Sequence, residues 1–233
     1  MPRNLLLSLF LCLLSPALLL PVTIVVNPNP TIIATSVTSS VTGADMAGLI
    51  VTATYNFPDG PQPVTLIWNA NGPDSGAAGT PPGTSLSVNG SASAVLAWHY
   101  SSTLLSPLIS LELDGAAAGI YFDRAHSGPG TPGSGSGADI SFSQLIPNGV
   151  ESDIVATYSG AVSVDGNPPQ NDLYSKLVVN FPAAPFGGLE PQDFEFTQPV
   201  DRNVAPEPAS SILALIALGL GFVVRSIRMR RAY

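Results

Sequence analysis

The segment LIVTATYNF, residues 49–57, alternates apolar and mainly polar side chains along its whole length. Apolar residues stand at every second position from Leu49 to Phe57, with Tyr55 among them. A two-residue period places alternate side chains on opposite faces of an extended chain. The segment therefore predicts a β-strand with one face in a core and the other toward solvent.

Comparable runs follow on both sides of this segment and are separated by turn signals. The further runs are residues 64–68, 92–100, 108–113, 120–122, 140–145, 154–164 and 173–181. Between them stand turn-forming sequences such as Asn89-Gly90, Asp114-Gly115 and Asn148-Gly149, in which Gly supplies the positive φ that tight turns need. Eight to ten short strands at this spacing predict an all-β fold, a single β-sandwich that could be jelly-roll-like.

The composition of the 233-residue chain also disfavours helices. Charged residues make up only 10% of it, while 22 Gly and 23 Pro favour turns and loops over amphipathic helices. Both ends of the chain are apolar and cannot belong to a soluble core. We therefore expect one β-sandwich surface domain over residues 23–200.

Charge is distributed unevenly along the chain. Residues 23–206 carry 15 acidic side chains against Arg124, Lys176 and Arg202, a net charge of −12. Such a surface repels a phosphate backbone, which makes nucleic acid an unsuitable partner; divalent cations, neutral sugars or basic partners fit better. The single cysteine, Cys12, lies in the N-terminal leucine run, so the domain itself offers no thiol for a disulfide, a zinc site or a nucleophile.

The N-terminus has the organisation of a signal peptide, assigned to residues 1–22. Arg3 precedes an apolar run at residues 5–20, ten of which are leucine. Ser15-Pro16-Ala17 offers small residues for cleavage but leaves an apolar stretch on the mature end. An uncleaved membrane anchor is the alternative reading.

The C-terminus, residues 201–233, has three parts in a fixed order. A Pro206-Glu207-Pro208 box lies within residues 205–210, an apolar helix is expected at 209–224, and an arginine cluster follows at 225–231, made of Arg225, Arg228, Arg230 and Arg231. The apolar segment would rise roughly 24 Å as a helix, somewhat less than the hydrocarbon core of a bilayer. The arginines resist translocation, so we expect a transmembrane helix with its C-terminus in the cytoplasm.

This tail resembles the PEP-CTERM sorting signal of Gram-negative bacteria. The resemblance implies recognition of Pro206, Glu207 and Pro208 by an exosortase-like membrane protease, with the four arginines as the stop-transfer element. It also implies transient anchoring in the inner membrane, release to the cell surface or extracellular matrix, and a link to exopolysaccharide. The same tail is sometimes catalogued under ice-binding proteins. A plain C-terminal anchor with a chance Pro-Glu-Pro sequence is the alternative.

Several residues are candidates for a catalytic role. Glu112 and Asp114 lie two apart on an expected strand, as a catalytic carboxylate pair would, but Asp114 opens a turn. His99 and His126, the latter close to Asp123, lack any metal-ligand spacing. No nucleophile elbow is present either. We therefore expect a protein that is not an enzyme.

Binding functions have somewhat better support in the sequence. Asp165, Asn167 and Asp172 gather hard oxygen ligands around one loop and are weak candidates for calcium, the one cofactor considered. Aromatic residues for sugar stacking exist in Trp68, Trp98 and Tyr100, but alternation places the last two on a core face.

Two biased segments and one short threonine pattern complete the sequence features. The Gly- and Ser-rich stretches at residues 71–85 and 127–137 are expected to be surface loops that line a binding face or tether two lobes. A single Thr52-x-Thr54 pattern without a repeat speaks against ice binding.

These observations favour an exported protein with a structural or adhesive role at the cell surface or in an exopolysaccharide or biofilm matrix. A carbohydrate-binding module is the first alternative, and a secreted hydrolase is the second. The expected partners are an exosortase-like protease, the membrane through the C-terminal helix, and polysaccharide.

Overall fold

The computed structural model describes residues 22–80, 83–89, 91–92, 97–142, 154–181 and 192–204. Within these ranges no helix is both long enough and apolar enough to cross a membrane. Residues 1–21 of the expected signal peptide and residues 205–233 of the expected sorting tail lie outside the described residues. Both terminal helices therefore stay predictions.

The described chain is nearly all β, as the sequence predicts. Its one helical element is the 3₁₀ turn η1 (Gly43–Met46). The strands are β1 (Thr23–Asn27), β2 (Ile32–Ala34), β3 (Val37–Thr38), β4 (Val41–Thr42), β5 (Ile50–Phe57), β6 (Gly60–Ala70), β7 (Gly76–Ala78), β8 (Thr84–Val88), β9 (Ser91–Ala92), β10 (Ala97–Ser102), β11 (Leu108–Asp114), β12 (Ile120–Asp123), β13 (Ser141–Phe142), β14 (Val155–Val164), β15 (Leu173–Asn180), β16 (Gln192–Thr197) and β17 (Val200–Asn203).

Strand β5 confirms the alternation of residues 49–57. Val51, Ala53 and Tyr55 are fully buried, and the residues between them are only partly buried. A two-residue turn at 58–59 then leads into β6, and Gly60 adopts a φ of 111° that other residues rarely accept. The resulting β5–β6 hairpin pairs along its whole length, from Ile50↔Ile67 to Phe57↔Gly60.

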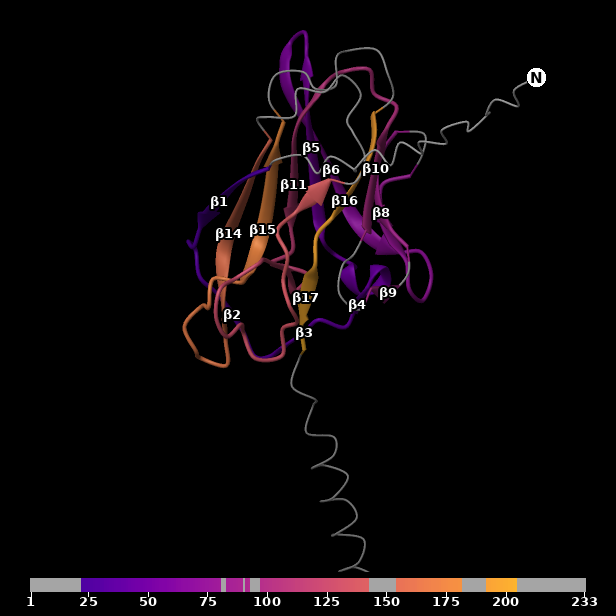
Figure 1. Ribbon diagram of the computed structural model, residues 1–233. Coiled ribbons are helices and arrows are strands. Elements are labelled where there is room, and N and C mark those ends of the chain that lie inside the picture. The colour runs from indigo at the N-terminus through magenta and orange to yellow at the C-terminus, as the bar shows by residue number, and fades with distance from the viewer. Residues whose placement is uncertain are drawn as a thin grey trace, which may run out of the picture.

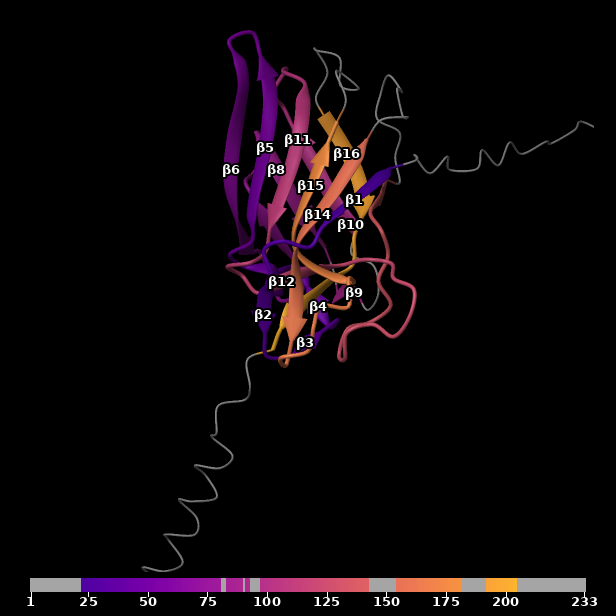
Figure 2. The ribbon, with the colours of Figure 1, turned by 90° about the vertical axis from the view of Figure 1, so that its left-hand side faces the viewer.

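A large, curled, mainly antiparallel sheet contains most of these strands. Figure 2 shows β6, β5, β11, β15, β14 and β1 following one another across one layer. The second layer runs through β7, β8, β10, β16 and β13. Strand β6 joins the layers, because residues 60–67 pair with β5 while residues 68–70 pair with β7.

The lower end of the first layer is built around β15, which is long enough to carry two partners on one side. Residues 176–180 of β15 pair with β11, and Leu173 and Tyr174 pair with β12. Gly115 ends β11, and a short loop leads to Ile120, whose N–H donates to the Gly115 carbonyl. Strand β12 then pairs with β17, and β17 with β3, at the end of the domain opposite the tip of the β5–β6 hairpin (Figure 1).

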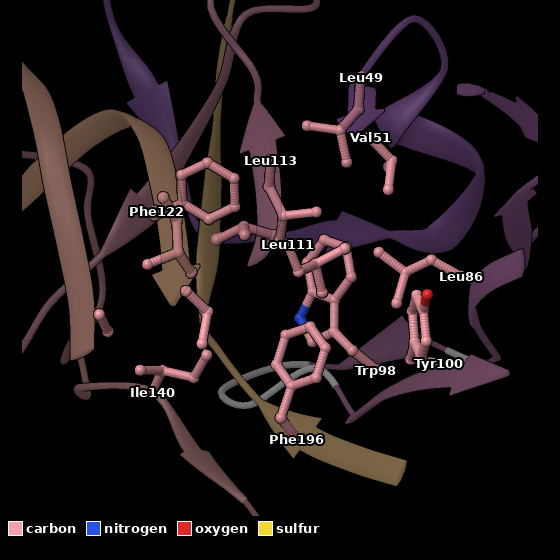
Figure 3. Packing of buried hydrophobic residues seen from close by; sticks show 14 of the residues in the cluster. Leu49, Val51, Leu86, Trp98, Tyr100, Leu111, Leu113, Phe122, Ile140 and Phe196 are labelled. Atoms are coloured by element: carbon pink, nitrogen blue, oxygen red, sulfur yellow. The ribbon is translucent and has the colours of Figure 1, made fainter. Parts of the chain in front are cut away.

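The space between the layers is filled by large side chains. Trp68 and Trp98 meet edge to face at 5.5 Å between ring centroids, and Trp98 stacks on Phe196 at 5.7 Å. Figure 3 shows Trp98 and Phe196 facing Leu111 and Leu113 of the first layer. Fully burying such an aromatic removes about 150–250 Å² from water, worth roughly 4–6 kcal/mol each. We call the following residues the aromatic core: Tyr55, Trp68, Trp98, Tyr100, Phe194 and Phe196.

All the strand regions expected from the sequence contain strands, but the structure has more elements than the predicted eight to ten. Strands β3, β4, β7 and β9 contain only two or three residues. A two-residue period cannot be recognised over so short a length. The sequence also gives no prediction for β1, β2, β8, β16 and β17. The expectation of a surface loop at residues 71–85 is wrong in part, because this stretch contains β7 and the buried start of β8.

Candidate functional site

The Gly- and Ser-rich segment 127–137 folds back over the lower end of the sheet. Thr131 within it is buried, and the Ser134 N–H closes a turn on the Thr131 carbonyl at 3.0 Å. Gly133 has a φ of 89° and lies against the Val37 carbonyl of β3, so closely that a side chain would collide with it. The predicted surface loop is therefore tied to the sheet at defined points.

Asp172 is the main anchor of this loop. It is fully buried, and its Oδ2 accepts the Thr131 N–H at 2.5 Å. Its Oδ1 accepts the Thr131 hydroxyl at 2.8 Å and the Leu173 N–H at 2.9 Å. Both oxygens of Asp172 are thus engaged in holding backbone.

The other two calcium candidates from the sequence lie elsewhere on the same β14–β15 connection. Asp165 and Asn167 are exposed, and the Asn167 side chain donates to the Val164 carbonyl at 3.1 Å. Among the residues that the structure describes, no three His, Cys, Asp or Glu side chains are grouped as a metal ion would need. Calcium binding by Asp165, Asn167 and Asp172 stays a prediction.

Two further carboxyls lie buried beneath the loop, on neighbouring strands. Asp123 ends β12 and Asp201 lies in β17, and each is only 1% exposed. Tyr121 pairs directly with Asp201, so Asp123, two residues further along, projects from the same face of the sheet. A side chain at Gly137 of the loop would collide with Asp123 Oδ1, which places that oxygen against the loop.

The surroundings of Asp123 and Asp201 disfavour ionisation of their carboxyl groups. Burial, followed by the charges of Asp201 and Asp172, raises the pKa of Asp123 to about 7. Burial, together with the charge of Asp172, raises the pKa of Asp201 to about 6. The Ser134 hydroxyl lies close enough to lower both pKa values in part, yet it forms no hydrogen bond with either carboxyl.

Both arginines next to these acids are turned toward other carboxylates. Arg124 Nε donates to Asp139 Oδ1 at 2.6 Å, and its guanidinium lies 5.5 Å from the centre of the Tyr158 ring. Arg202 Nη1 contacts Asp45 Oδ1 at 2.6 Å. Asp123 and Asp201 thus form no ion pair among the described residues. We call Asp123, Asp172, Asp201 and the loop 127–137 the acidic end.

The surface above the acidic end is hollowed. A depression of about 620 Å³ is lined by Ala125, His126, Gly128 and residues 130–137 of the loop. A second depression of about 250 Å³ shares Gly130, Thr131 and Pro132 and extends to Gln170. His126 lies at this surface, with its Nδ1 3.4 Å from the Arg124 carbonyl oxygen.

The residues weighed for catalysis have ordinary partners. Glu112 and Asp114 do share one face of β11, and both contact Lys176 Nζ, at 2.8 Å and 3.1 Å. His99 Nε2 lies 2.9 Å from Asp193 Oδ1 on the exposed surface of β10 and β16. These contacts explain the charged groups without a reaction, although the absence of catalysis stays a prediction.

The aromatic residues weighed for sugar stacking belong to the core. Trp68, Trp98 and Tyr100 are completely buried, which confirms the core assignment of Trp98 and Tyr100. Trp68 Nε1 donates to the Gly43 carbonyl at 2.7 Å and Trp98 Nε1 to the Gln198 carbonyl at 3.0 Å. Among the described residues no aromatic side chain is exposed, so a stacking platform is lacking in this part of the chain.

The sorting residues lie outside the described part of the chain: Pro206, Glu207, Pro208, Arg225, Arg228, Arg230 and Arg231. The described domain ends at Val204, whose N–H donates to the Ser36 carbonyl at 2.9 Å. The Val204 carbonyl accepts the hydroxyls of Thr35 and Ser36, at 3.2 Å and 3.0 Å. The chain is therefore held firmly two residues before Pro206.

Sequence reasoning missed the Asp123–Asp201 neighbourhood. The sequence indicates only that Asp123 is close to His126, and it gives no reason to single out Asp201. The one available signal is that Asp123 directly follows the apolar Ile120-Tyr121-Phe122 run, where an acid must either end the strand or be buried. Nothing in the sequence pairs it with Asp201.

Fold and site together define a nearly all-β protein in which two buried carboxyls beneath a Gly-rich loop have no ion-pair partner in the described part of the chain. Comparison of the chain with protein-family models, with curated proteins and with solved structures finds no match in any of the three. Function has to be argued from this chain itself.

Proposed function

We propose that this chain is an exported, non-catalytic surface protein with a structural or adhesive role in an exopolysaccharide or biofilm matrix. A signal peptide would export it, and an exosortase-like protease would sort it through Pro206, Glu207 and Pro208. The observation that carries the proposal is the tail itself: a Pro-Glu-Pro box, an apolar segment and four arginines follow in order directly after the domain.

The way the domain ends supports this role for the tail. Hydrogen bonds from Thr35 and Ser36 hold Val204, and Pro206 follows only two residues later. Pro206 and Pro208 cannot continue a regular helix or donate to a sheet. Recognition would therefore occur between a folded domain and the membrane, and cleavage there would leave the domain whole.

The fold of the described residues is compatible with a structural or adhesive domain. The two layers face each other across the aromatic core, which supports the finer description of the domain as a single β-sandwich; a jelly-roll connection within it stays a prediction. Trp68, Trp98 and Tyr100 are unavailable for sugar stacking, and the Glu112 and Asp114 carboxylates are both bound to Lys176. Neither the carbohydrate-binding nor the hydrolase alternative gains a specific observation from the described residues.

Intact-mass analysis of the protein recovered from each fraction of its native host tests the proposal. We expect the membrane fraction to contain some uncut chain, and the surface or medium fraction to contain a form that ends between Pro206 and Ala209. A Pro206→Ala/Pro208→Ala variant should accumulate uncut. The matched control is Pro168→Ala in an exposed loop, which should be processed normally. Uncut wild-type chain in the inner membrane alone would overturn the proposal.

A further inference from the structure

Four oxygens of the acidic end are buried and lack any hydrogen-bond partner among the described residues. They are Asp123 Oδ1, both carboxyl oxygens of Asp201 and the Ser134 hydroxyl. A buried acceptor without a partner is costly, and a buried carboxylate without a counter-charge is more so. Something beyond the described protein atoms must compensate for them when the acids are ionised.

The neighbouring protein groups cannot supply that compensation. Arg124 is paired with Asp139. Arg202 contacts Asp45 through Nη1, and its buried Nε donates to no described group, the two acids included. Asp172, the third acid, adds negative charge, and both its oxygens already hold Thr131 and Leu173. A single proton shared between the two acids would satisfy two of the four oxygens, one as donor and one as acceptor, and would leave the other two without partners.

We propose that Asp123, Asp201 and Ser134 bind one calcium ion between the β12–β17 pair and the loop 127–137. This site is separate from the exposed Asp165 and Asn167, and the proposal does not depend on the sorting tail. Two carboxylates would balance the charge of the divalent ion. The raised pKa values of Asp123 and Asp201 reflect the same uncompensated burial.

The available ligands fit calcium better than other metals. All of them are hard oxygen donors, which calcium and magnesium prefer over the His and Cys sites of transition metals. Calcium accepts six to eight ligands in irregular geometry, so main-chain carbonyls and water can complete a site with two carboxylates and one hydroxyl. Magnesium demands a near-regular octahedron, which a Gly-rich loop over a twisted sheet is poorly suited to provide.

The ion would fasten the loop to the sheet beside its existing anchor. Asp172 holds Thr131, and the ion would hold Ser134, three residues further along. The two depressions lined by the loop would then have fixed walls. Extracellular calcium modules work at dissociation constants of about 10⁻⁴–10⁻³ M, and this range is sufficient for an exported protein.

Calcium titration of the full chain, purified in a mild non-ionic detergent, tests the proposal. We expect isothermal titration calorimetry to show calcium binding. At a calcium concentration about 100-fold above the Kd, the Tm should be roughly 5–10 °C higher than that of the EDTA-treated sample. Magnesium at the same concentration should give less than half of that shift.

The Asp201→Asn variant tests whether Asp201 binds calcium or only contributes to the stability of the fold. The substitution removes a buried unpaired charge at constant shape, so it should keep or raise the Tm in EDTA while abolishing the calcium shift. Asp165→Asn is the matched control: it also removes one carboxylate, on an exposed turn at a φ of 52° that Asn accepts, and it should leave the shift intact. Ser134→Ala, which keeps both carboxyls, should weaken calcium binding several-fold.

Three results would overturn the proposal. The first is a wild-type chain for which calorimetry detects no calcium binding and calcium does not shift the Tm. The second is an Asp201→Asn variant that responds to calcium as the wild type does. The third is loss of the response in Asp165→Asn alone, which would move the ion to the exposed loop.

Discussion

The aromatic core and the acidic end are both buried, but they treat their polar atoms in opposite ways. In the aromatic core the Tyr55 hydroxyl contacts Thr84 and Tyr100 at 2.6 Å and Ser102 at 2.8 Å. In the acidic end, Asp201 has no partner for either oxygen among the described residues. Buried polar groups that are fully hydrogen-bonded help to specify a fold, whereas buried polar groups without partners indicate a site where a ligand could bind.

The difference also separates what stabilises the domain from what it could bind. The aromatic core joins the two layers through side chains that close on each other and on main-chain carbonyls. In the acidic end the loop 127–137 covers two carboxyls, Asp123 and Asp201, whose charges burial disfavours. Substitutions in the first region should therefore lower stability under all conditions, whereas the second should respond to pH and ions.

Trp98→Ala should produce the largest effect. Trp98 is fully buried, stacks on Phe196 at 5.7 Å and meets Trp68 at 5.5 Å. Removing so large a core side chain costs about 3–5 kcal/mol, which urea unfolding of the full chain in detergent would measure. Ile67→Ala, at a side chain 61% exposed, is the control and should change stability by less than about 0.5 kcal/mol. Equal losses in the two variants would show that the layers do not pack around Trp98.

A pH series in EDTA should reveal the acidic end. The pKa of Asp123 is raised to about 7 and that of Asp201 to about 6, both above the unfolded value of about 3.9. The folded state therefore holds these protons more tightly, and this stability is fully present below about pH 4 and is lost as the pH rises through 6 and 7. Asp172 and Ser134 face the pair, and Arg124 is held by Asp139.

Comparison with Asp201→Asn isolates the contribution of that carboxyl to the pH dependence. Between pH 4.5 and pH 8 the wild type should lose roughly 2–3 kcal/mol more than the variant, as measured by urea unfolding. Saturating calcium should remove most of this difference, because the ion replaces the lost protons. Parallel pH profiles of the two proteins in EDTA would contradict the placement of an unpaired charge at Asp201.

Tyr55→Phe tests the satisfied side of the comparison and should have a smaller effect. The substitution keeps the ring but leaves Thr84, Tyr100 and Ser102 without their shared partner, at a cost of about 1–2 kcal/mol. The loss should be the same with and without calcium. Thr65→Val is the control, because its hydroxyl contacts Thr52 in an exposed position and should contribute little. A Tyr55→Phe variant as stable as the wild type would mean that the hydroxyl network adds no net stability.

Sequence alone predicted the aromatic core better than the acidic end, for a physical reason. Alternation is local, so residues 49–57 and the common face of Trp98 and Tyr100 could be read directly from the chain. The acidic end depends on long-range pairing: Asp123 and Asp201 meet only because β12 pairs with β17. In the sequence each acid looks like a solvated residue at a strand end or before a basic neighbour.

The loop shows the same limit from another side. Its composition predicts a surface segment, and it does line two depressions. Composition could not show that Asp172, distant in sequence, accepts two hydrogen bonds from Thr131 and fixes the loop against the sheet. For the same reason the sequence groups the buried Asp172 with its exposed neighbours Asp165 and Asn167.

Lys176→Met should have the smallest effect, because it concerns paired carboxylates outside both buried regions. Lys176 contacts Glu112 at 2.8 Å and Asp114 at 3.1 Å, but all three side chains are about one third exposed, so water already solvates the charges. Such pairs contribute about 0–1 kcal/mol, and Met keeps the apolar stem against the sheet. Urea unfolding at low and high salt should show a small loss that salt reduces further. A loss of stability above about 2 kcal/mol that salt does not reduce would show that Glu112 and Asp114 depend strongly on a counter-charge. Dependence on a counter-charge would then not be a special property of Asp123 and Asp201.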